Sequence, residues 1–457
     1  MSRHKLNQVV AATLALSLLP LFSRPASALE IKRSVLNNGA VLLVSAQHNL
    51  PMVTMAIAFD AGSRRDPKGQ EGLAHLAADC LTEGTRQLSA DELNRQIDFL
   101  GSSLSVSASR DYATASVTSL KRYWPDTLKL MAQVLTQPAL TDRDIERKRA
   151  EDVAALKAAE EDPGYTAQAA FVSALFGPTP YGHLSEGTAA SVQKLTAEEV
   201  RNFYHTYYRP KGAVIAVVGD VDPAAVTADL NRELGALAGS APPQAPFPAP
   251  PLPAGLVLKV IDRDVSQANV ILGAPGIARS DPDYYRILVM NYIYGGGGFA
   301  SHLVKQVRSK AGLVYSIGSD YAAGLYPGAF EVVLETKNAS ANEAIKLVLA
   351  QMRQMQEAPV ASDELASAKK YLIGSFPLKL DTQSAIANFL IQVEVYHLGL
   401  DYADRYPKLI GAVTTQDVLK VARRYLHPNH LLIVAVANQH QAQVHVGSPQ
   451  SGAGGGS

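Results

Sequence analysis

The chain has 457 residues, of which 47% are hydrophobic and 18% are charged. This composition is that of an average globular protein and excludes a disordered, collagen-like or coiled-coil chain. Lysine plus arginine and aspartate plus glutamate both number 42, so the overall charge gives no reason to expect nucleic acid or an anionic surface as a partner. At about 150 residues per domain, the length accommodates two or three domains, and we take two as the working number.

Residues 1–28 have the pattern of a secretory signal peptide. Basic residues precede the apolar run 9–22, and the small residues 26–28 provide a cleavage site. The apolar run is shorter than the ~20 residues that a membrane-spanning helix needs, so we expect a soluble mature chain without a transmembrane segment. Cys80 is the only cysteine, which excludes an intramolecular disulfide and a thiolate metal cluster. The expected location is a bacterial periplasm.

The segment 71–84 is predicted to form an amphipathic helix. One face is apolar and is expected to be buried: Leu73, Leu76, Ala77, Cys80 and Leu81. His75, Ala78 and Asp79 share the opposite face. Side chains at i and i+4 of a helix point the same way, so this second face suits a one-turn metal site.

The alternating segment 104–117 predicts a hairpin that turns near residues 109–111. It would offer an edge to an extended peptide by strand addition, or simply contribute core strands. Residues 237–255 are rich in proline and predict an extended linker that divides the mature chain into two comparable halves.

The two halves contain a repeated pattern at a constant offset of 218 residues. Thr196–Val200, a Tyr-x-x-Pro motif and an apolar run match Thr414–Val418 and the motifs that follow it. Each copy predicts a helix with a threonine N-cap, a break at proline and then a buried strand. The most economical explanation is the duplication of one α+β domain.

We therefore predict an α+β fold with two homologous domains, residues 29–236 and 256–438. Each domain is expected to have a mainly antiparallel sheet packed with helices and to form half of a clamshell. Such a shape suits the enclosure of an extended chain. The tail 439–457, which ends in a glycine-rich stretch, is predicted to be disordered.

Residues 72–85, followed by residues 89–117, resemble the pitrilysin or insulinase family of zinc peptidases, in particular its two-domain branch related to mitochondrial processing peptidase. The resemblance extends over nearly all of residues 30–437. In that family the helix contains H-x-x-E-H, whose histidines bind zinc while the glutamate is the general base. A second glutamate on another helix is the third ligand.

By this resemblance, His75 stands at the first histidine, Ala78 at the glutamate, Asp79 at the second histidine and Ala155 at the third ligand. Alanine neither binds a metal nor accepts a proton, and Asp79 replaces the second histidine, so three of the four required groups are missing. We expect no metal and no cofactor in this chain, and zinc in a partner subunit instead.

Two other interpretations of this helix remain open. In the first, His75 and Asp79 bind a metal together with Glu151 or Asp152. In the second, which we favour over the first, His75 and Asp79 form an ordinary hydrogen-bonded pair on a polar face.

The second half contains the glycines Gly295, Gly296, Gly297 and Gly298, which predict a turn, followed by a helix with Arg308 and then Tyr315. The resemblance implies that this arginine and tyrosine hold the substrate backbone and stabilise the charge on the scissile carbonyl. The glycine run lacks the spacing of a phosphate-binding loop and is expected to allow a close approach of backbones or to supply mobility.

The sequence thus predicts a periplasmic protein that is inactive alone and acts as the non-zinc subunit of a heterodimeric peptidase. Its partner would be a paralogue with an intact H-x-x-E-H, and its substrate an unfolded peptide. One alternative is a non-enzymatic peptide-binding or scaffold protein of the envelope, and another is an autonomous metallopeptidase with altered ligands.

Overall fold

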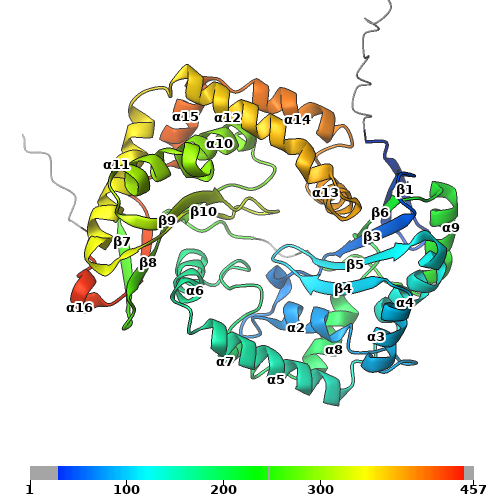
Figure 1. The fold of residues 1–457 in the computed structure, drawn as a ribbon. Coiled ribbons are helices and arrows are strands. Elements are labelled where there is room, and N and C mark those ends of the chain that lie inside the picture. The colour runs from blue at the N-terminus through cyan, green and yellow to red at the C-terminus, as the bar shows by residue number, and fades with distance from the viewer. Residues whose placement is uncertain (1–28, 245–246, 447–457) are drawn as a thin grey trace, which may run out of the picture. The chain divides into compact units, whose positions relative to one another are not determined.

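Two sheets, one from each half of the sequence, organise the fold, and helices cover them (Figure 1). The computed structural model describes residues 29–244 and 247–446. The predicted signal peptide lies outside these residues.

The first half contains the following elements, in which η denotes a short 3₁₀ or π segment: β1 (Lys32–Val35), β2 (Val41–Ala46), β3 (Met52–Phe59), η1 (Ser63–Arg65), α2 (Leu73–Cys80), α3 (Ala90–Phe99), β4 (Ser103–Ala108), β5 (Ala113–Leu120), η2 (Lys121–Tyr123), α4 (Trp124–Thr136), α5 (Asp142–Ala159), α6 (Pro163–Phe176), α7 (Ala189–Val192), α8 (Ala197–Tyr207), β6 (Val214–Gly219) and α9 (Pro223–Glu233).

The second half contains these elements: β7 (Val257–Asp262), β8 (Gln267–Pro275), α10 (Tyr284–Asn291), η3 (Tyr292–Gly296), η4 (Gly298–Ala300), η5 (Val304–Lys310), β9 (Val314–Tyr321), β10 (Ala329–Lys337), η6 (Asn338–Ser340), α11 (Ala341–Glu357), α12 (Ser362–Ser375), η7 (Phe376–Leu380), α13 (Gln383–Val395), α14 (Tyr402–Gly411), α15 (Thr415–Tyr425), β11 (Leu432–Ala437) and α16 (Gln439–Ala442).

The two sheets have the same topology. The first has the order β1-β2-β6-β3-β5-β4 and the second the order β7-β11-β8-β10-β9, so β1 is the one strand of the first sheet without a counterpart. In each sheet a single parallel pair, β2 with β6 or β7 with β11, adjoins antiparallel pairs. The predicted α+β fold with two homologous, mainly antiparallel domains is therefore confirmed.

The repeat recognised in the sequence is exact in the structure. Helices α8 and α15, and strands β6 and β11, begin and end 218 residues apart. Each helix starts with a capping box, in which Thr196 pairs with Glu199 and Thr414 with Asp417. The threonine and the acidic residue satisfy backbone N–H groups that the first turn leaves free, which fixes where both helices begin.

The hairpin predicted at residues 104–117 is formed by β4 and β5. Its turn is closed by the N–H of Ser109, which donates to the carbonyl of Tyr112 at 2.9 Å. Strand β4 is an edge strand of the first sheet, with β5 as its only neighbour in that sheet. The hairpin therefore contributes both a core strand and an edge.

Each half supplies a helix that packs on the sheet of the other half. Helix α6 lies against β8 and β11 of the second sheet, and α13 lies against β3 and β6 of the first (Figure 1). Phe171 of α6 is fully buried in this contact, and a Cβ atom at Gly273 of β8 would come within 2.4 Å of its ring. The glycine thus makes room for a phenyl ring from the opposite half.

The proline-rich segment 237–255 forms no helix or strand in its described residues. It is nevertheless held in place, because the Pro243 carbonyl accepts a hydrogen bond from Arg65 at 2.6 Å. The ring of Phe247 stacks on Tyr326 with the centroids 4.3 Å apart. The linker therefore packs against residues of both halves, although its sequence predicts only extended backbone.

The predicted disorder from Gln439 onward is wrong for residues 439–446. Asn438 caps α16, and the side-chain amide of Asn342 donates to the carbonyls of Ala442 and Gln443 at 3.0 and 3.1 Å. Val444 is buried. Local capping and contacts with α11 hold this segment; the remainder of the tail, 447–457, lies outside the described residues.

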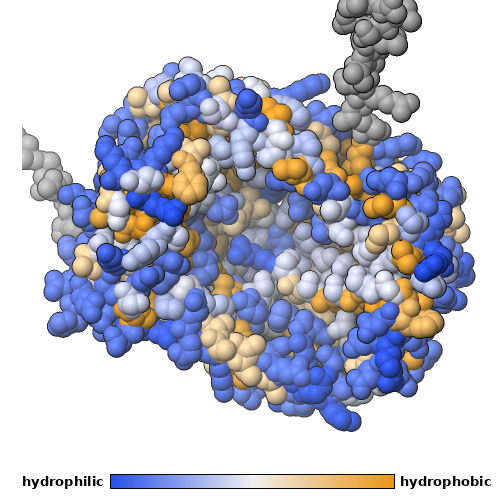
Figure 2. All heavy atoms as spheres, viewed as in Figure 1, coloured by the Kyte–Doolittle hydropathy of each residue, from blue (hydrophilic) through white to orange (hydrophobic). Residues whose placement is uncertain are grey.

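None of the helices in the described part of the chain is both long and apolar enough to span a membrane. On the face shown in Figure 2, hydrophilic residues predominate over the helices and apolar residues gather in separate groups.

Candidate functional site

Helix α2, which contains His75 and Asp79, is fixed at its N-terminus by a buried carboxylate. Asp66 accepts hydrogen bonds from the backbone N–H groups of Ala74 at 2.7 Å and Gly72 at 2.8 Å, which belong to the donors that a first helical turn leaves free. Burial raises the pKa of Asp66 well above its usual value, although these backbone N–H groups favour the charged form.

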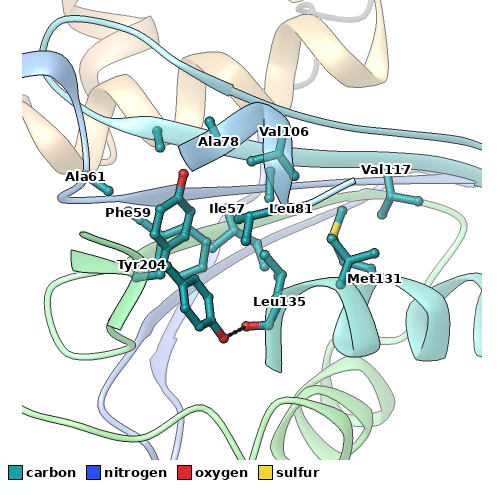
Figure 3. Close-up of a cluster of buried hydrophobic side chains, with 14 of the residues drawn as sticks. Ile57, Phe59, Ala61, Ala78, Leu81, Val106, Val117, Met131, Leu135 and Tyr204 are labelled. Carbon is teal, nitrogen blue, oxygen red and sulfur yellow. Dashed lines mark hydrogen bonds between the residues drawn. The ribbon is translucent and has the colours of Figure 1, made fainter. Parts of the chain in front are cut away.

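The apolar face of α2 is buried as predicted, but Ala78 also belongs to the core. Figure 3 shows Ala78 and Leu81 among side chains of β3, β4 and β5, including Ile57, Val106 and Val117. Ala78 has no exposed surface. Ala78 is thus buried although its spacing in the sequence groups it with His75 and Asp79, because strand β4 packs against helix α2.

The two partly exposed side chains of α2, those of His75 and Asp79, face α5. Ligand atoms of His75, Asp79 and Asp152 all lie within 4.8 Å of one another. The ammonium group of Lys148, also on α5, lies 3.0 Å from Asp79 Oδ2 and 3.1 Å from Asp152 Oδ1. Lys148 and Asp152 are four residues apart and therefore lie on the same face of α5.

The structure distinguishes between the sequence-based alternatives for this helix. His75 Nε2 is 3.9 Å from Asp79 Oδ2, which is too long for the hydrogen-bonded pair that we favoured, because Asp79 interacts with Lys148 instead. Asp152 joins the cluster, whereas Glu151 pairs with Arg147. Ala155, the predicted position of the third ligand, is exposed one turn further along α5.

Charge in the cluster is set by burial and by the Lys148 ammonium. Burial lowers the pKa of Lys148, but hydrogen bonds and charge attraction from Asp79 and Asp152 outweigh this effect and raise it above its usual value. Burial raises the pKa of Asp152 in spite of Lys148. The thiol of Cys80 is buried, as predicted for the apolar face of this helix, and burial raises its pKa, which makes it a poor nucleophile.

These residues do not fit the catalytic zinc that the family resemblance implies. Such a site needs three ligands, an open position for water and a base to take its proton. In this chain an ammonium group interacts with two of the three candidate ligands, and Ala78 offers no base.

The predicted turn at Gly295–Gly298 is only partly a turn. Gly295 and Gly296 continue α10 as a π-helical segment, and Gly298, with φ of 56°, begins a 3₁₀ segment. A Cβ atom at Gly295 would lie 2.4 Å from Ser319 Oγ on β9. The glycine thus permits the close backbone approach that we expected, but within a helical segment.

Arg308 and Tyr315 lie on neighbouring elements, η5 and β9, which pack together. Both side chains are exposed, Tyr315 to 49%. The Arg308 guanidinium lies 5.3 Å from the ring centre of Phe299, and within the described residues it has no carboxylate within 4 Å. Among the described residues, no hydrogen bond or ion pair joins Arg308 or Tyr315 to His75, Asp79 or Asp152.

Sequence reasoning missed Lys148. The available signal was a lysine four residues before Asp152, on a helix expected to face His75 and Asp79. Only the structure shows that both carboxylates interact with this one ammonium group.

The fold and the altered metal site define a zinc-peptidase homologue without the residues for zinc catalysis. Residues 41–188 match the family model described as insulinase (peptidase family M16), and residues 194–372 match that of the peptidase M16 inactive domain. The chain belongs to this family and is a non-catalytic homologue that lacks H-x-x-E-H.

Three relatives illustrate the range of the family. An uncharacterized zinc protease of Streptomyces coelicolor is 28% identical, covering 91% of this chain and 92% of its own. The non-peptidase homolog YmxG of Helicobacter pylori is 27% identical, with 87% and 92% covered. The mitochondrial-processing peptidase subunit beta of Lentinula edodes is 23% identical, with 89% of each covered.

Among solved structures, a peptidase M16 inactive domain from Pseudomonas fluorescens superposes with a TM-score of 0.83 at 28% identity, covering 90% of this chain and 98% of the other. A protease from Helicobacter pylori gives 0.81 at 20% identity, covering 89% and 99%, and supports the fold alone.

Proposed function

We propose that this protein is the non-zinc subunit of a heterodimeric peptidase. Its partner is a paralogue with an intact H-x-x-E-H, and its location is the periplasm, as the pattern of residues 1–28 predicts. The observation that supports this proposal is the contrast between the two halves. Lys148 neutralises carboxylates at the former zinc position, while Arg308 and Tyr315 remain exposed.

Arg308 and Tyr315 would act on the substrate of the partner. A guanidinium group without a carboxylate partner and a phenol are suitable donors for a peptide carbonyl and for the negative charge that develops on it during hydrolysis. Arg308 is held near Phe299, which leaves its N–H groups free to donate. In this role the pair needs no metal in its own subunit.

The substrate class is an unfolded peptide. Strand β4 is an edge strand, so its outer backbone groups are available for pairing with an extended chain. A folded domain has few free segments of this kind. An extended peptide would therefore be recognised through its backbone by the edge strand and through its carbonyl groups by the Arg308 and Tyr315 side chains.

The test is a cleavage assay with a quenched fluorescent peptide, using this chain alone, a paralogue with H-x-x-E-H alone, and both together. We expect activity only from the mixture. We also expect Arg308→Ala and Tyr315→Phe to lower kcat at least 10-fold without loss of assembly, whereas Arg95→Ala, at an exposed arginine of α3, serves as the matched control. Full activity of the lone chain, or of the mixture with both variants, contradicts the proposal.

A second function is favoured by one comparison, the relative named a non-peptidase homolog. In that case the chain binds peptides or supports an envelope complex without taking part in cleavage. Peptide binding to the isolated chain, together with a paralogue whose activity does not respond to its addition, distinguishes this function from the divided enzyme.

A further inference from the structure

We propose that the Lys148 ammonium takes the place of a metal ion in the His75, Asp79 and Asp152 cluster, and that the cluster binds a divalent transition-metal ion once this ammonium is removed. These four residues belong to the first half of the chain, and their arrangement does not depend on a partner subunit.

The geometry of Lys148 supports the substitution of one cation for another. Its Nζ atom contacts one carboxylate from each of two helices, Asp79 of α2 at 3.0 Å and Asp152 of α5 at 3.1 Å. A metal ion bound by the same two carboxylates would likewise connect the helices. Because Nζ interacts with these oxygens, an incoming metal ion has to displace a positive charge.

The donor set that remains without Lys148 is that of a transition-metal site. His75 offers an imidazole nitrogen, and Asp79 and Asp152 offer carboxylate oxygens, with the three ligand atoms within 4.8 Å of one another. Nitrogen and oxygen donors of this kind suit Zn²⁺ and Co²⁺.

One carboxylate oxygen of Asp152 has no hydrogen-bond partner, which also supports a cation site in this cluster. Asp152 is only 8% exposed, and its Oδ2 atom is buried without a hydrogen-bond partner. A buried carboxylate oxygen normally has a partner, because leaving it without one costs free energy. Lys148 satisfies Oδ1 alone, so the cluster retains an acceptor that a metal ion can use.

The neighbouring contacts explain why the cluster is stable without a metal. Arg147, next to Lys148, pairs with Glu83 just beyond the end of α2. Two consecutive basic residues of α5 therefore connect it to α2 and to the turn that follows. This arrangement differs from the family's zinc site, since a side chain of the protein itself supplies the cation.

The experiment measures metal binding by the purified mature chain after dialysis against a chelator. Isothermal titration with Zn²⁺ and the visible absorption of Co²⁺ report affinity and coordination. We expect Lys148→Ala to bind one ion per chain at least 100-fold more tightly than the wild type. We also expect Zn²⁺ to raise the melting temperature of this variant but not that of the wild type.

Three variants serve as controls. Lys148→Arg retains the positive charge and should bind as weakly as the wild type. Lys157→Ala removes an exposed lysine of the same helix and should also behave as the wild type. The double variant Lys148→Ala, Asp152→Asn removes a ligand and should lose the tight binding.

Two outcomes overturn the inference. One is a folded Lys148→Ala protein, judged by circular dichroism, that binds Zn²⁺ no more tightly than the wild type. The other requires no variant at Lys148: tight binding of one Zn²⁺ by the wild-type chain that is abolished by His75→Ala shows that the ammonium does not exclude the metal.

Discussion

Single side chains determine what the first half of this protein can do. Ala78 fills a place in the hydrophobic core, and Lys148 neutralises the carboxylates of Asp79 and Asp152. Replacing the alanine by glutamate would place a carboxylate in an environment with no exposed surface, where a charge is costly. Restoring peptidase chemistry therefore requires more than new zinc ligands at positions 79 and 155, because the general base at position 78 would also have to be accommodated in the core.

His427 gives a prediction about pH. It is half-buried beside His430, and both burial and the neighbouring imidazole lower its pKa below the usual 6.5. The folded state therefore binds this proton less readily than the unfolded state. The contribution of neutral His427 to the free energy of unfolding is therefore complete above pH 6.5 and is lost as the pH falls through the lowered pKa.

We expect His427→Gln to become more stable relative to the wild type as the pH is lowered from 8 to 5. One proton changes the free energy of unfolding by at most about 1.4 kcal/mol per pH unit. Urea denaturation at several pH values measures the difference, and the values at pH 8 provide the reference. A difference between the two proteins that is constant from pH 8 to 5 would refute the prediction.

At the scale of helices and strands, the repeated capping boxes were predictable because they depend on residues three positions apart. Thr196 and Thr414 begin α8 and α15 as their sequences indicate. The π-helical segments η3 and η5 were not predictable. Both segments pack against β9, a contact that no local sequence pattern encodes.

Gly295 tests how strictly that contact constrains the chain. A Cβ atom there would lie 2.4 Å from Ser319 Oγ and 2.7 Å from Leu303 Cδ1, both of which are buried residues. We expect Gly295→Ala to lower the free energy of unfolding by about 1–3 kcal/mol, the usual cost of overpacking a core.

Gly374 of α12 is the matched control for Gly295. A Cβ atom at this position meets no atom within 4 Å, and the residue lies in a regular helix. Gly374→Ala is expected to stabilise the protein by about 0.4–1 kcal/mol, because it restricts the unfolded chain. Equal effects of the two substitutions in urea denaturation would contradict this account of η3.

At the scale of the whole molecule, the sequence predicted the duplication but not how the halves contact one another. Asp111, in the turn between β4 and β5, is buried and accepts a hydrogen bond from the backbone N–H of Leu325 at 2.9 Å. The hydroxyl of Tyr396 lies 3.4 Å from the same carboxylate. These partners are more than 200 residues away, so no local pattern connects them.

Asp111→Ala should weaken the contact between the two halves. The loss of an acceptor that serves the backbone N–H of Leu325 is expected to lower the free energy of unfolding by about 1–3 kcal/mol. Hydrogen exchange, followed by mass spectrometry, should become faster around Leu325. Asp98→Ala, at an exposed position of α3, is the control, and unchanged exchange around Leu325 in Asp111→Ala would exclude this role.

The exchange of α6 and α13 bears on the origin of the molecule. Phe171 and its neighbours on α6 find their apolar surroundings on β8 and β11, and α13 finds its own on β3 and β6. An ancestral polypeptide of half the present length would have left one face of its sheet uncovered unless two copies paired. In such a pair, the helix of each copy would pack on the sheet of the other. Gene fusion through residues 237–255 would then have turned an obligate subunit interface into a permanent interior.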